Sequence, residues 1–392
     1  MTHPARVLAC GWFGEGNLGD EAMLEGLIRL LRRTFDKPAI TVMTADLEDA
    51  RRRFGVSAIT RATPERSGFR NLPLVRASAR ADLVTLGGGD LIREQADGTV
   101  PARNWLARVR VPLALGRPVA VIGVSVGELR TPAVIEEVRH ELLRCTVIAA
   151  RDAESSARLR DLTGREALVM GDLALEALDD PDTAAVVGGR AREAASGEDP
   201  GRRPRIGVAI RNIQGRGASV QADAGDRLTA ALAAALDQVV NATGATVELV
   251  PFRTGRAKRD DDALAGAALA AQATTGNAWV HHAAPGDARA FAAIARELDI
   301  VVGVRLHATI LAAASGVPML GIAYDPKVSG FLDDLGLPGQ CLPLDADADT
   351  IAATITRTLA DMTIRPAALA GVERMRARTV ALEPLLRQAA RR

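Results

Sequence analysis

The chain has 392 residues, more than a typical single hydrophobic core supports, so we expect two domains. Its 49 Lys and Arg residues balance 48 Asp and Glu residues, and only 3% of the residues are aromatic. A net charge of +1 and so few rings argue against a nucleic-acid binder, which needs a basic surface and stacking platforms. Any cationic site must therefore be local.

Cysteine usage and the N-terminus indicate the compartment. The three cysteines are odd in number and widely spaced, and we expect them to be reduced: Cys10, Cys145 and Cys341. No charged-then-apolar signal pattern opens the chain, and no apolar run approaches the length of a membrane span. We expect a cytoplasmic protein, with contact at the inner face of the membrane left open.

In the first half, apolar runs alternate with helical periodicity, which predicts a doubly wound parallel sheet over residues 1–178. The expected strands are 7–11, 40–44, 82–86, 119–126, 147–150 and 168–170. The expected helices are 20–34, 47–54, 103–115, 132–144 and 153–162. Strand and helix alternate throughout, as in Rossmann-like domains.

The periodicity fades over 179–204 into Asp, Gly, Pro and charged residues, which predicts a linker. A second alternating series over 205–365 predicts another doubly wound domain. Its expected elements are strands 205–211, 247–252 and 279–282, a long helix ending at Ala242 after the first of these strands, a helix at 287–298, a strand to Gly303, a helix from 307 to 316 and a strand to Tyr324. Residues 366–392 predict an Arg-rich helix that can cross back to the first domain. The expected fold class is α/β, with two doubly wound Rossmann-like domains.

The first strand runs into a glycine-rich turn over residues 11–22. Its glycines, including the loop glycines Gly14 and Gly16, do not have the G-x-G-x-x-G spacing, and acids occupy the turn where a pyrophosphate would lie. A dinucleotide site is therefore disfavoured. Asn17 and Asp20 suit a sugar hydroxyl, although Asp20 is equally well explained as a helix N-cap.

A second glycine turn is expected after the third predicted strand. It contains Gly88 and Gly89, followed by Asp90 and Glu94. A further turn at 123–127 follows the next strand, so three glycine-opened turns face the same sheet edge. We expect one ligand cleft there, with Asn17, Asp90 and Glu94 binding an acceptor.

In the second domain, charged residues follow apolar strands at the edge where open α/β sheets bind ligands. Arg305 and His307 follow one strand, Lys327 follows the next, and Arg211 ends the first. Three cations and one imidazole suit a small, multiply charged anion. Arg305 could instead pair with a neighbouring carboxylate, but its position favours a ligand, and we expect Arg305→Ala to weaken ligand binding while leaving the fold intact.

Other site chemistries lack their signatures. No Cys, His and carboxylate cluster has zinc spacing, and adjacent His281 and His282 point to opposite faces of a strand. No Gly-x-Ser-x-Gly elbow or Walker A sequence is present. We therefore expect neither serine-hydrolase nor kinase chemistry, no metal and no cofactor.

Taken together, these motifs resemble the polysaccharide pyruvyl transferase family, most closely its CsaB-type bacterial cell-wall branch. The matching stretches are 11–24, 86–91, 123–127, 150–152 with Ser155, 171–172, 206–211, 249–252 and 299–335. The last carries Arg-Leu-His, Gly-Val-Pro and Tyr-Asp-Pro-Lys and is the most specific. The resemblance implies a GT-B-like architecture, with two Rossmann-like domains facing across a cleft.

The resemblance also implies transfer of pyruvate from phosphoenolpyruvate onto two sugar hydroxyls as a cyclic ketal. The implied acceptor is a lipid-linked saccharide containing N-acetylmannosamine, whose ketal is recognised by S-layer homology domains. By residue match, Arg305 takes a donor-binding position and His307 a catalytic one. The chemistry fits the residues: Arg305, Arg211 and Lys327 can neutralise phosphoenolpyruvate, and His307 can act as acid, with Asp20 a weaker candidate base.

Two other functions stay open at this stage. A GT-B nucleotide-sugar glycosyltransferase would need an acidic residue late in the second domain to hold a ribose, and Asp325 could serve. A non-catalytic sugar- or anion-binding protein is the other. Phosphate release from phosphoenolpyruvate would separate the three functions.

Overall fold

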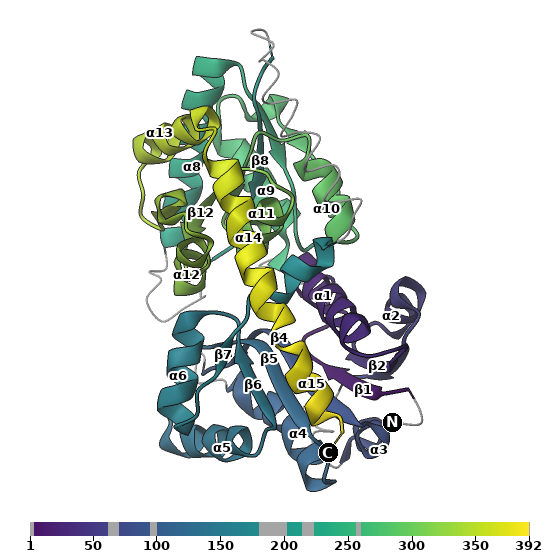
Figure 1. Cartoon of the computed structure of the whole chain (residues 1–392). Coiled ribbons are helices and arrows are strands. Elements are labelled where there is room, and N and C mark those ends of the chain that lie inside the picture. The colour runs from purple at the N-terminus through teal and green to yellow at the C-terminus, as the bar shows by residue number, and fades with distance from the viewer. Residues whose placement is uncertain are drawn as a thin grey trace. The chain divides into compact units, whose positions relative to one another are not determined.

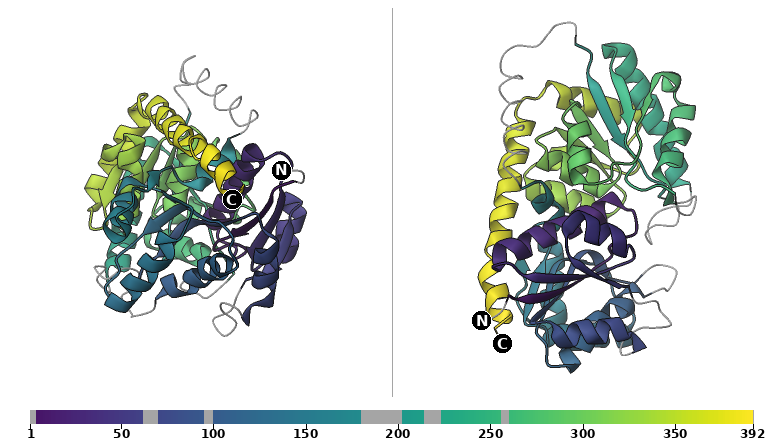
Figure 2. Two further views of the ribbon diagram at one scale, coloured as in Figure 1. Left: turned by 60° about the horizontal axis from the view of Figure 1, so that its bottom comes forward. Right: turned by 90° about the vertical axis from the view of Figure 1, so that its right-hand side faces the viewer.

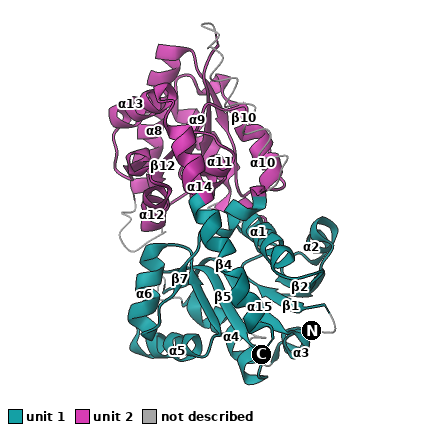
Figure 3. Ribbon diagram, in the orientation of Figure 1, with its two compact units in different colours: residues 1–15, 20–177, 374–392 teal, residues 16–19, 178–373 magenta. Residues whose placement is uncertain are grey.

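The computed structural model describes residues 4–61, 70–94, 100–179, 202–213, 223–255 and 260–391 (Figure 1). The chain divides into two compact units (Figure 3). The first contains Met1–Glu15, Asp20–Ala177 and Arg374–Arg392, and the second contains Gly16–Gly19 and Leu178–Glu373. Most of the predicted linker at 179–204 lies outside the described residues.

The first unit is built on a seven-stranded parallel sheet with the order β3-β2-β1-β4-β5-β6-β7. Its strands are β1 Arg6–Cys10, β2 Ala39–Thr44, β3 Ser57–Thr60, β4 Leu83–Ile92, β5 Val119–Val126, β6 Val147–Ala150 and β7 Leu168–Val169. The strand order reverses between β1 and β4, which is the switch point of a Rossmann-like sheet.

Helices join these strands: α1 Leu18–Thr34, α2 Leu47–Phe54, α3 Leu72–Arg80, α4 Pro101–Ala114, α5 Pro132–Leu143 and α6 Ala153–Thr163. Alternate residues of β1 face opposite sides of the sheet, so Leu8 and Cys10 join one buried cluster with side chains of α3 to α6, including Trp105 and Val138. Continuous apolar strands such as β5, all of whose residues are buried, are what a sheet covered on both faces requires.

The C-terminal helices α14 (Ile364–Val380) and α15 (Glu383–Ala389) end the described chain. Glu383 of α15 accepts a 2.6 Å hydrogen bond from Arg33 Nε, and Arg387 Nε donates to the carbonyl of Thr34 at 2.7 Å. These contacts place α15 beside the end of α1 (Figure 2). From Arg374 onward the chain therefore belongs to the first unit.

The second unit carries a six-stranded parallel sheet with the order β10-β9-β8-β11-β12-β13. Its strands are β8 Arg205–Ala209, β9 Thr246–Leu249, β10 Val280–His281, β11 Ile300–Gly303, β12 Met319–Ala323 and β13 Cys341–Pro343. Its helices are α8 Ala224–Thr243, α9 Asp262–Gln272, α10 Ala288–Ala295, α11 Leu306–Ala314, α12 Pro326–Leu335 and α13 Ala348–Ala360. The two parallel sheets with alternating helices confirm the predicted α/β class.

Several elements differ from the prediction. The following elements were not predicted: β3, α3, α9, α12, β13 and α13. The two strands have only four and three residues, too few to show an alternating pattern. The triple glycine expected in a turn lies inside β4, which continues to Ile92 with an irregularity in its pairing to β5. Gly88 and Gly89 have φ of 76° and 89°, so they let the strand distort without ending it.

Two further properties concern the helices and the thiols. Among the described residues no helix combines the length and apolarity needed to cross a membrane. Cys10 and Cys145 are buried thiols, and burial raises the pKa of each to about 12, so neither is a reactive thiolate.

Candidate active site

The predicted donor residues meet at the switch point of the second sheet. Gly303 at the end of β11 pairs in register with Ala209 at the end of β8, so the two strands end side by side. Arg305 and Arg211 each lie two residues beyond these ends. Because β12 pairs with β11, the residues that follow β12, including Lys327, start from the same edge.

Arg305 is held by a carboxylate that the sequence analysis did not single out. Its Nε and Nη2 donate to Asp262 Oδ2 and Oδ1 at 2.9 Å and 2.5 Å, a bidentate ion pair. Both residues are buried, with 7% of Arg305 and 2% of Asp262 exposed. Asp262 Oδ2 also accepts from the backbone N–H groups of Phe252 and Arg253 at 3.1 Å and 3.0 Å.

This pair corrects the expectation that Arg305→Ala would leave the fold intact. Removing the guanidinium would leave Asp262 as an uncompensated buried charge, which costs about 3–5 kcal/mol. Asp262 is the last of three consecutive aspartates and the first residue of α9, which Asp261 caps. Neither this helix nor the inward-facing carboxylate was predicted from the sequence.

Arg211, Tyr324 and Lys327 form a second contact group. Arg211 Nη1 donates to the Tyr324 hydroxyl at 2.9 Å, and the guanidinium carbon lies 5.2 Å from the ring centroid. Lys327 Nζ lies 5.5 Å from the same centroid. Burial lowers the pKa of Arg211, although the neighbouring phenol opposes this. Tyr324 was not predicted as a site residue, because it reads as the last apolar residue of a strand.

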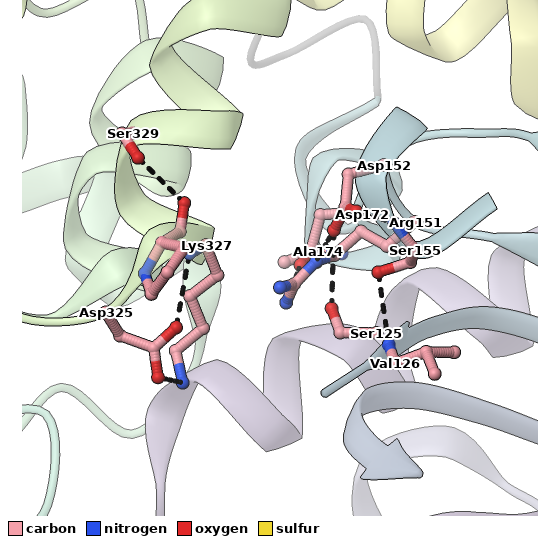
Figure 4. A network of polar contacts seen from close by, with 11 residues as sticks. Ser125, Val126, Arg151, Asp152, Ser155, Asp172, Ala174, Asp325, Lys327 and Ser329 are labelled. Atoms are coloured by element: carbon pink, nitrogen blue, oxygen red, sulfur yellow. Dashed lines mark hydrogen bonds and ion pairs between the residues drawn. The ribbon is translucent and has the colours of Figure 1, made fainter. Parts of the chain in front are cut away.

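The Asp325 carboxylate accepts hydrogen bonds from α12, the helix that it caps. It is the N-cap of α12: its Oδ1 accepts from the Lys327 backbone N–H at 3.2 Å, and its Oδ2 accepts from Lys327 Nζ at 3.2 Å (Figure 4). These contacts orient Lys327. They also make Asp325 less suited to the ribose-binding role that a glycosyltransferase would need.

His307 is the second residue of α11 and is half-buried. The segment Gly16–Gly19, although it follows β1, belongs to the second unit and packs against this imidazole. A Cβ placed on Gly19 would lie 2.2 Å from His307 Nδ1, so only glycine fits there. Asn17 forms an antiparallel bridge with Arg253, and Leu18 N–H donates to the carbonyl of Phe252 at 2.9 Å.

Asn17 and Gly16 were expected among the loops of the first domain, and the structure corrects this placement. Backbone pairing between residues 17–18 and residues 252–253 explains it. Glycine spacing alone carries no information about such a distant partner. Of the predicted site residues, Asn17, Gly16, Arg211, Arg305, His307 and Lys327 therefore lie in the second unit, and Asp20, Asp90, Glu94, Gly14, Gly88 and Gly89 in the first.

In the first unit, the glycine turn is closed by Glu21 rather than by Asp20. Glu21 Oε1 accepts from the Gly14 backbone N–H at 2.8 Å, and burial raises the pKa of this carboxyl to about 7. Gly14 has φ of 78°, and a Cβ there would lie 2.2 Å from Thr44 Oγ1. Because α1 begins at Leu18, Asp20 lies within the first helical turn and is not the N-cap.

Gly88, Gly89 and Asp90 have identified packing partners. Cβ atoms on the two glycines would lie 3.1 Å and 3.4 Å from Met23 side-chain atoms of α1, so glycine lets α1 approach β4 closely. Asp90, near the end of β4, pairs with Arg93 at 2.8 Å and is half-buried. The two glycines therefore serve helix packing, while Asp90 is partly exposed at the sheet edge.

Glu94 has a structural role in the loop before α5. Its carboxylate accepts from the backbone N–H groups of Arg130 and Thr131 at 2.9 Å and 3.1 Å, which fixes the loop before α5. Burial alone would raise the pKa of this carboxyl, but these donors outweigh it and the pKa is lowered. Because both oxygens accept from the backbone, Glu94 holds the loop before α5 rather than an acceptor.

A buried polar network lies at the carboxyl ends of β5 and β6. Arg151 contacts Asp172 and Asp152 at 3.3 Å and 3.4 Å, and Ser125 Oγ donates to Asp152 at 3.4 Å (Figure 4). Arg151 is 6% exposed, and its Nη2 is buried with no hydrogen-bond partner among the described residues. A buried guanidinium nitrogen that lacks an acceptor suits a polar ligand.

An exposed indole lies beyond β1 in the same unit. Trp12 is 40% exposed and packs edge-to-face on Trp105, with ring centroids 5.7 Å apart. The Arg61 guanidinium lies 4.0 Å from the Trp12 ring centroid. Trp12 was not predicted as a site residue, but a single anchored indole can support a sugar ring. Among the described residues, no group of three His, Cys, Asp or Glu side chains is placed to hold a metal ion.

The chain is similar to a known protein family and to several solved structures. The family described as polysaccharide pyruvyl transferase matches residues 17–326. No curated protein matches the chain. Among solved structures, Anabaena HepE (Alr3699) in complex with UDP-glucose aligns with a TM-score of 0.61 and 13% identity over 98% of both chains.

Two further solved structures share the fold. A Rickettsia africae glycosyltransferase aligns with a TM-score of 0.59 and 12% identity, covering 98% of this chain and 97% of that one. The UDP-GlcNAc 2-epimerase of Methanocaldococcus jannaschii aligns at 0.58 and 11%, covering 95% and 99%. At such low identity these likenesses establish the two-domain Rossmann-like fold and no activity.

Proposed function

Because the chain belongs to the polysaccharide pyruvyl transferase family, we propose that it transfers pyruvate from phosphoenolpyruvate onto two hydroxyls of a saccharide, forming a cyclic ketal and releasing phosphate. The observation that carries this proposal is the convergence of Arg211, Arg305 and Lys327 with His307 at the switch point of the second sheet. Phosphoenolpyruvate carries a phosphate and a carboxylate, which match three fixed cations.

The cations and the imidazole have separate tasks. Arg305 is locked by Asp262, so it presents a fixed charge, whereas Arg211 and Lys327 meet around Tyr324 and can neutralise a second anionic group. His307 donates a proton to the methylene carbon of the donor, which leaves an oxocarbenium-like centre at the neighbouring carbon. A sugar hydroxyl attacks that carbon. Phosphate then leaves, and a second hydroxyl closes the ketal.

This scheme needs no metal and no cofactor, since the protein supplies the positive charge. Gly19 lies against the His307 ring and fixes its orientation. Asn17 is held in the same unit by its bridge to Arg253 and remains our candidate ligand for the acceptor in that unit.

For the acceptor we propose a lipid-linked cell-wall or capsular saccharide containing N-acetylmannosamine, as in the CsaB-type branch. Pyruvyl transfer onto this acceptor at the inner face of the membrane would give a ketal that anchors S-layer proteins. In the first unit, Asp90 and Asp20 remain candidate ligands, with Asp20 the weaker candidate base. Arg151 and the partly exposed Trp12 indole add a polar donor and an aromatic contact surface.

The test is an assay of the purified chain with phosphoenolpyruvate and a synthetic lipid-linked saccharide containing N-acetylmannosamine. We expect inorganic phosphate and an acceptor whose mass increases by one pyruvate minus one water. Sugar transfer from a nucleotide sugar with no reaction of phosphoenolpyruvate would support the glycosyltransferase alternative. Binding of either donor without product would support a non-catalytic role.

A further inference from the structure

Tyr324 occupies an unusual position for a phenol. It is 9% exposed, it directly follows β12, and its hydroxyl oxygen accepts a hydrogen bond from Arg211 Nη1 at 2.9 Å. Arg211 comes from the end of β8, and Lys327, from the first turn of α12, lies over the ring. Two cations, which follow different strands, therefore lie against the Tyr324 side chain: Arg211 at its hydroxyl and Lys327 over its ring.

The charged groups facing Tyr324 favour its ionised form. Burial opposes ionisation, but the positive charges of Lys327, Arg211 and Arg305 outweigh both burial and the nearby carboxylate of Asp325. The pKa of the phenol falls from its usual value of 10.0 to about 8. At pH 7 such a group is roughly one-tenth ionised, compared with about a thousandth for an ordinary tyrosine.

On the premise of the proposed pyruvyl transfer, we infer that Tyr324 is the general base that removes the proton from the first attacking sugar hydroxyl. The scheme built on His307 supplies an acid but leaves this proton without an acceptor in the second unit. Tyr324 lies among the cations that would bind the donor. A carboxylate among these cations would pair with one of them, whereas a phenolate accepts the Arg211 hydrogen bond and keeps lone pairs for the substrate.

The proton transfers balance over one turnover. In the first step the hydroxyl O–H bond breaks, its proton passes to the Tyr324 phenolate, and the oxygen bonds to the central carbon of the donor. The π electrons of the donor meanwhile take a proton from the His307 imidazolium to form the methyl group. In the second step the bond between carbon and bridging oxygen breaks, and phosphate leaves with the electron pair. The second hydroxyl attacks and returns a proton to His307, while the phenol proton leaves with the phosphate.

The first test needs no substrate. Tyr324 is the only tyrosine among the 392 residues, so the ultraviolet absorption of phenolate reports this one group without background. We expect a single titration with a midpoint near 8, absent in Tyr324→Phe. Lys327→Gln should move the midpoint upward, and Lys37→Gln, at an exposed lysine of the first unit, should not. A midpoint near 10 in the wild-type protein would overturn the inference.

The second test measures turnover. Tyr324→Phe should lower kcat by roughly two to four orders of magnitude, leave the KM for phosphoenolpyruvate within a few-fold, and abolish the rise of kcat/KM with pH near 8. If the phenol only positioned Arg211, the KM would rise instead and the pH profile would keep its shape. Ser329→Ala is the matched control: it also removes one hydroxyl, which lies on α12 and donates to the Pro326 carbonyl at 2.9 Å. Full turnover in Tyr324→Phe would refute this inference alone. A wild-type protein that releases no phosphate from phosphoenolpyruvate would refute the proposed function.

Discussion

The buried pair of Asp262 and Arg305 makes the most quantitative prediction. Asp262→Asn keeps the size of the side chain but removes the charge that balances Arg305, and it sets an amide NH₂ where one carboxylate oxygen accepts. With 8% and 1% of the Arg305 and Asp262 side chains exposed, water cannot replace the lost partner. Breaking a buried pair of this kind costs about 3–5 kcal/mol.

Thermal unfolding followed by calorimetry measures this loss. For a domain of this size each kcal/mol shifts Tm by about 2–4 °C, so we expect the second unit to melt on the order of 10 °C lower. Asp261→Asn is the matched control. Asp261 Oδ1 caps α9 by accepting from Ala263 and Leu264 at 2.9 Å and 3.3 Å, and Asn caps a helix as well as Asp does. The change loses only the exposed hydrogen bond from the Gly255 N–H to Oδ2, which contributes about 1 kcal/mol. If Asp262→Asn melts within about 2 °C of the wild-type protein, the pair does not hold Arg305 as argued.

Four further changes have defined outcomes. Because burial raises the pKa of Glu21 from 4.5 to about 7, the folded state loses stability as pH rises through that interval. Glu21→Gln should remove this dependence of the free energy of unfolding on pH, measured by urea titration. It should also stabilise the protein at pH 8 by up to about 3 kcal/mol. An unchanged slope would contradict the assignment. Gly19→Ala should displace His307 and lower turnover by about a hundredfold or more, while Gly286→Ala, whose Cβ meets nothing within 4 Å, should not; equal activities would refute the packing argument. His307→Gln should keep donor affinity within a few-fold by calorimetry and reduce turnover by roughly two to four orders of magnitude; full turnover would limit His307 to positioning. Turnover should survive chelators, and recovery only on adding magnesium would contradict the metal-free scheme.

Hydrophobic patterning determined much of the fold. Strands such as β5 and helices such as α2 are predicted with their observed bounds, because uninterrupted apolar runs and helical periodicity depend only on local residues. The turn predicted at the triple glycine was wrong, since local flexibility at Gly88 does not reveal whether a strand ends there or distorts and continues. Packing of Met23 against it decides the outcome, and that contact is long-range.

The site residues likewise divide into those that the local sequence predicts and those that depend on distant partners. Arg305, His307 and Lys327 could be found because residues after parallel strands share one edge of the sheet. Asp262 and Gly19 could not, because each acts through a partner more than 40 positions away, Arg305 and His307 respectively. Tyr324 was hidden for a different reason: its strand position suggests packing, and only the cations from two other strand ends give its hydroxyl a chemical role.

The most direct test of pyruvyl transfer follows the bridging oxygen of phosphoenolpyruvate, which joins the central carbon to phosphorus. With a heavy-oxygen label at that position, attack of the sugar at carbon breaks the carbon–oxygen bond. Mass spectrometry of a turnover with the saccharide acceptor should then find the label in inorganic phosphate and none in the ketal. Label retained in the pyruvyl product would mean that the phosphorus–oxygen bond breaks, and it would contradict the proposed transfer.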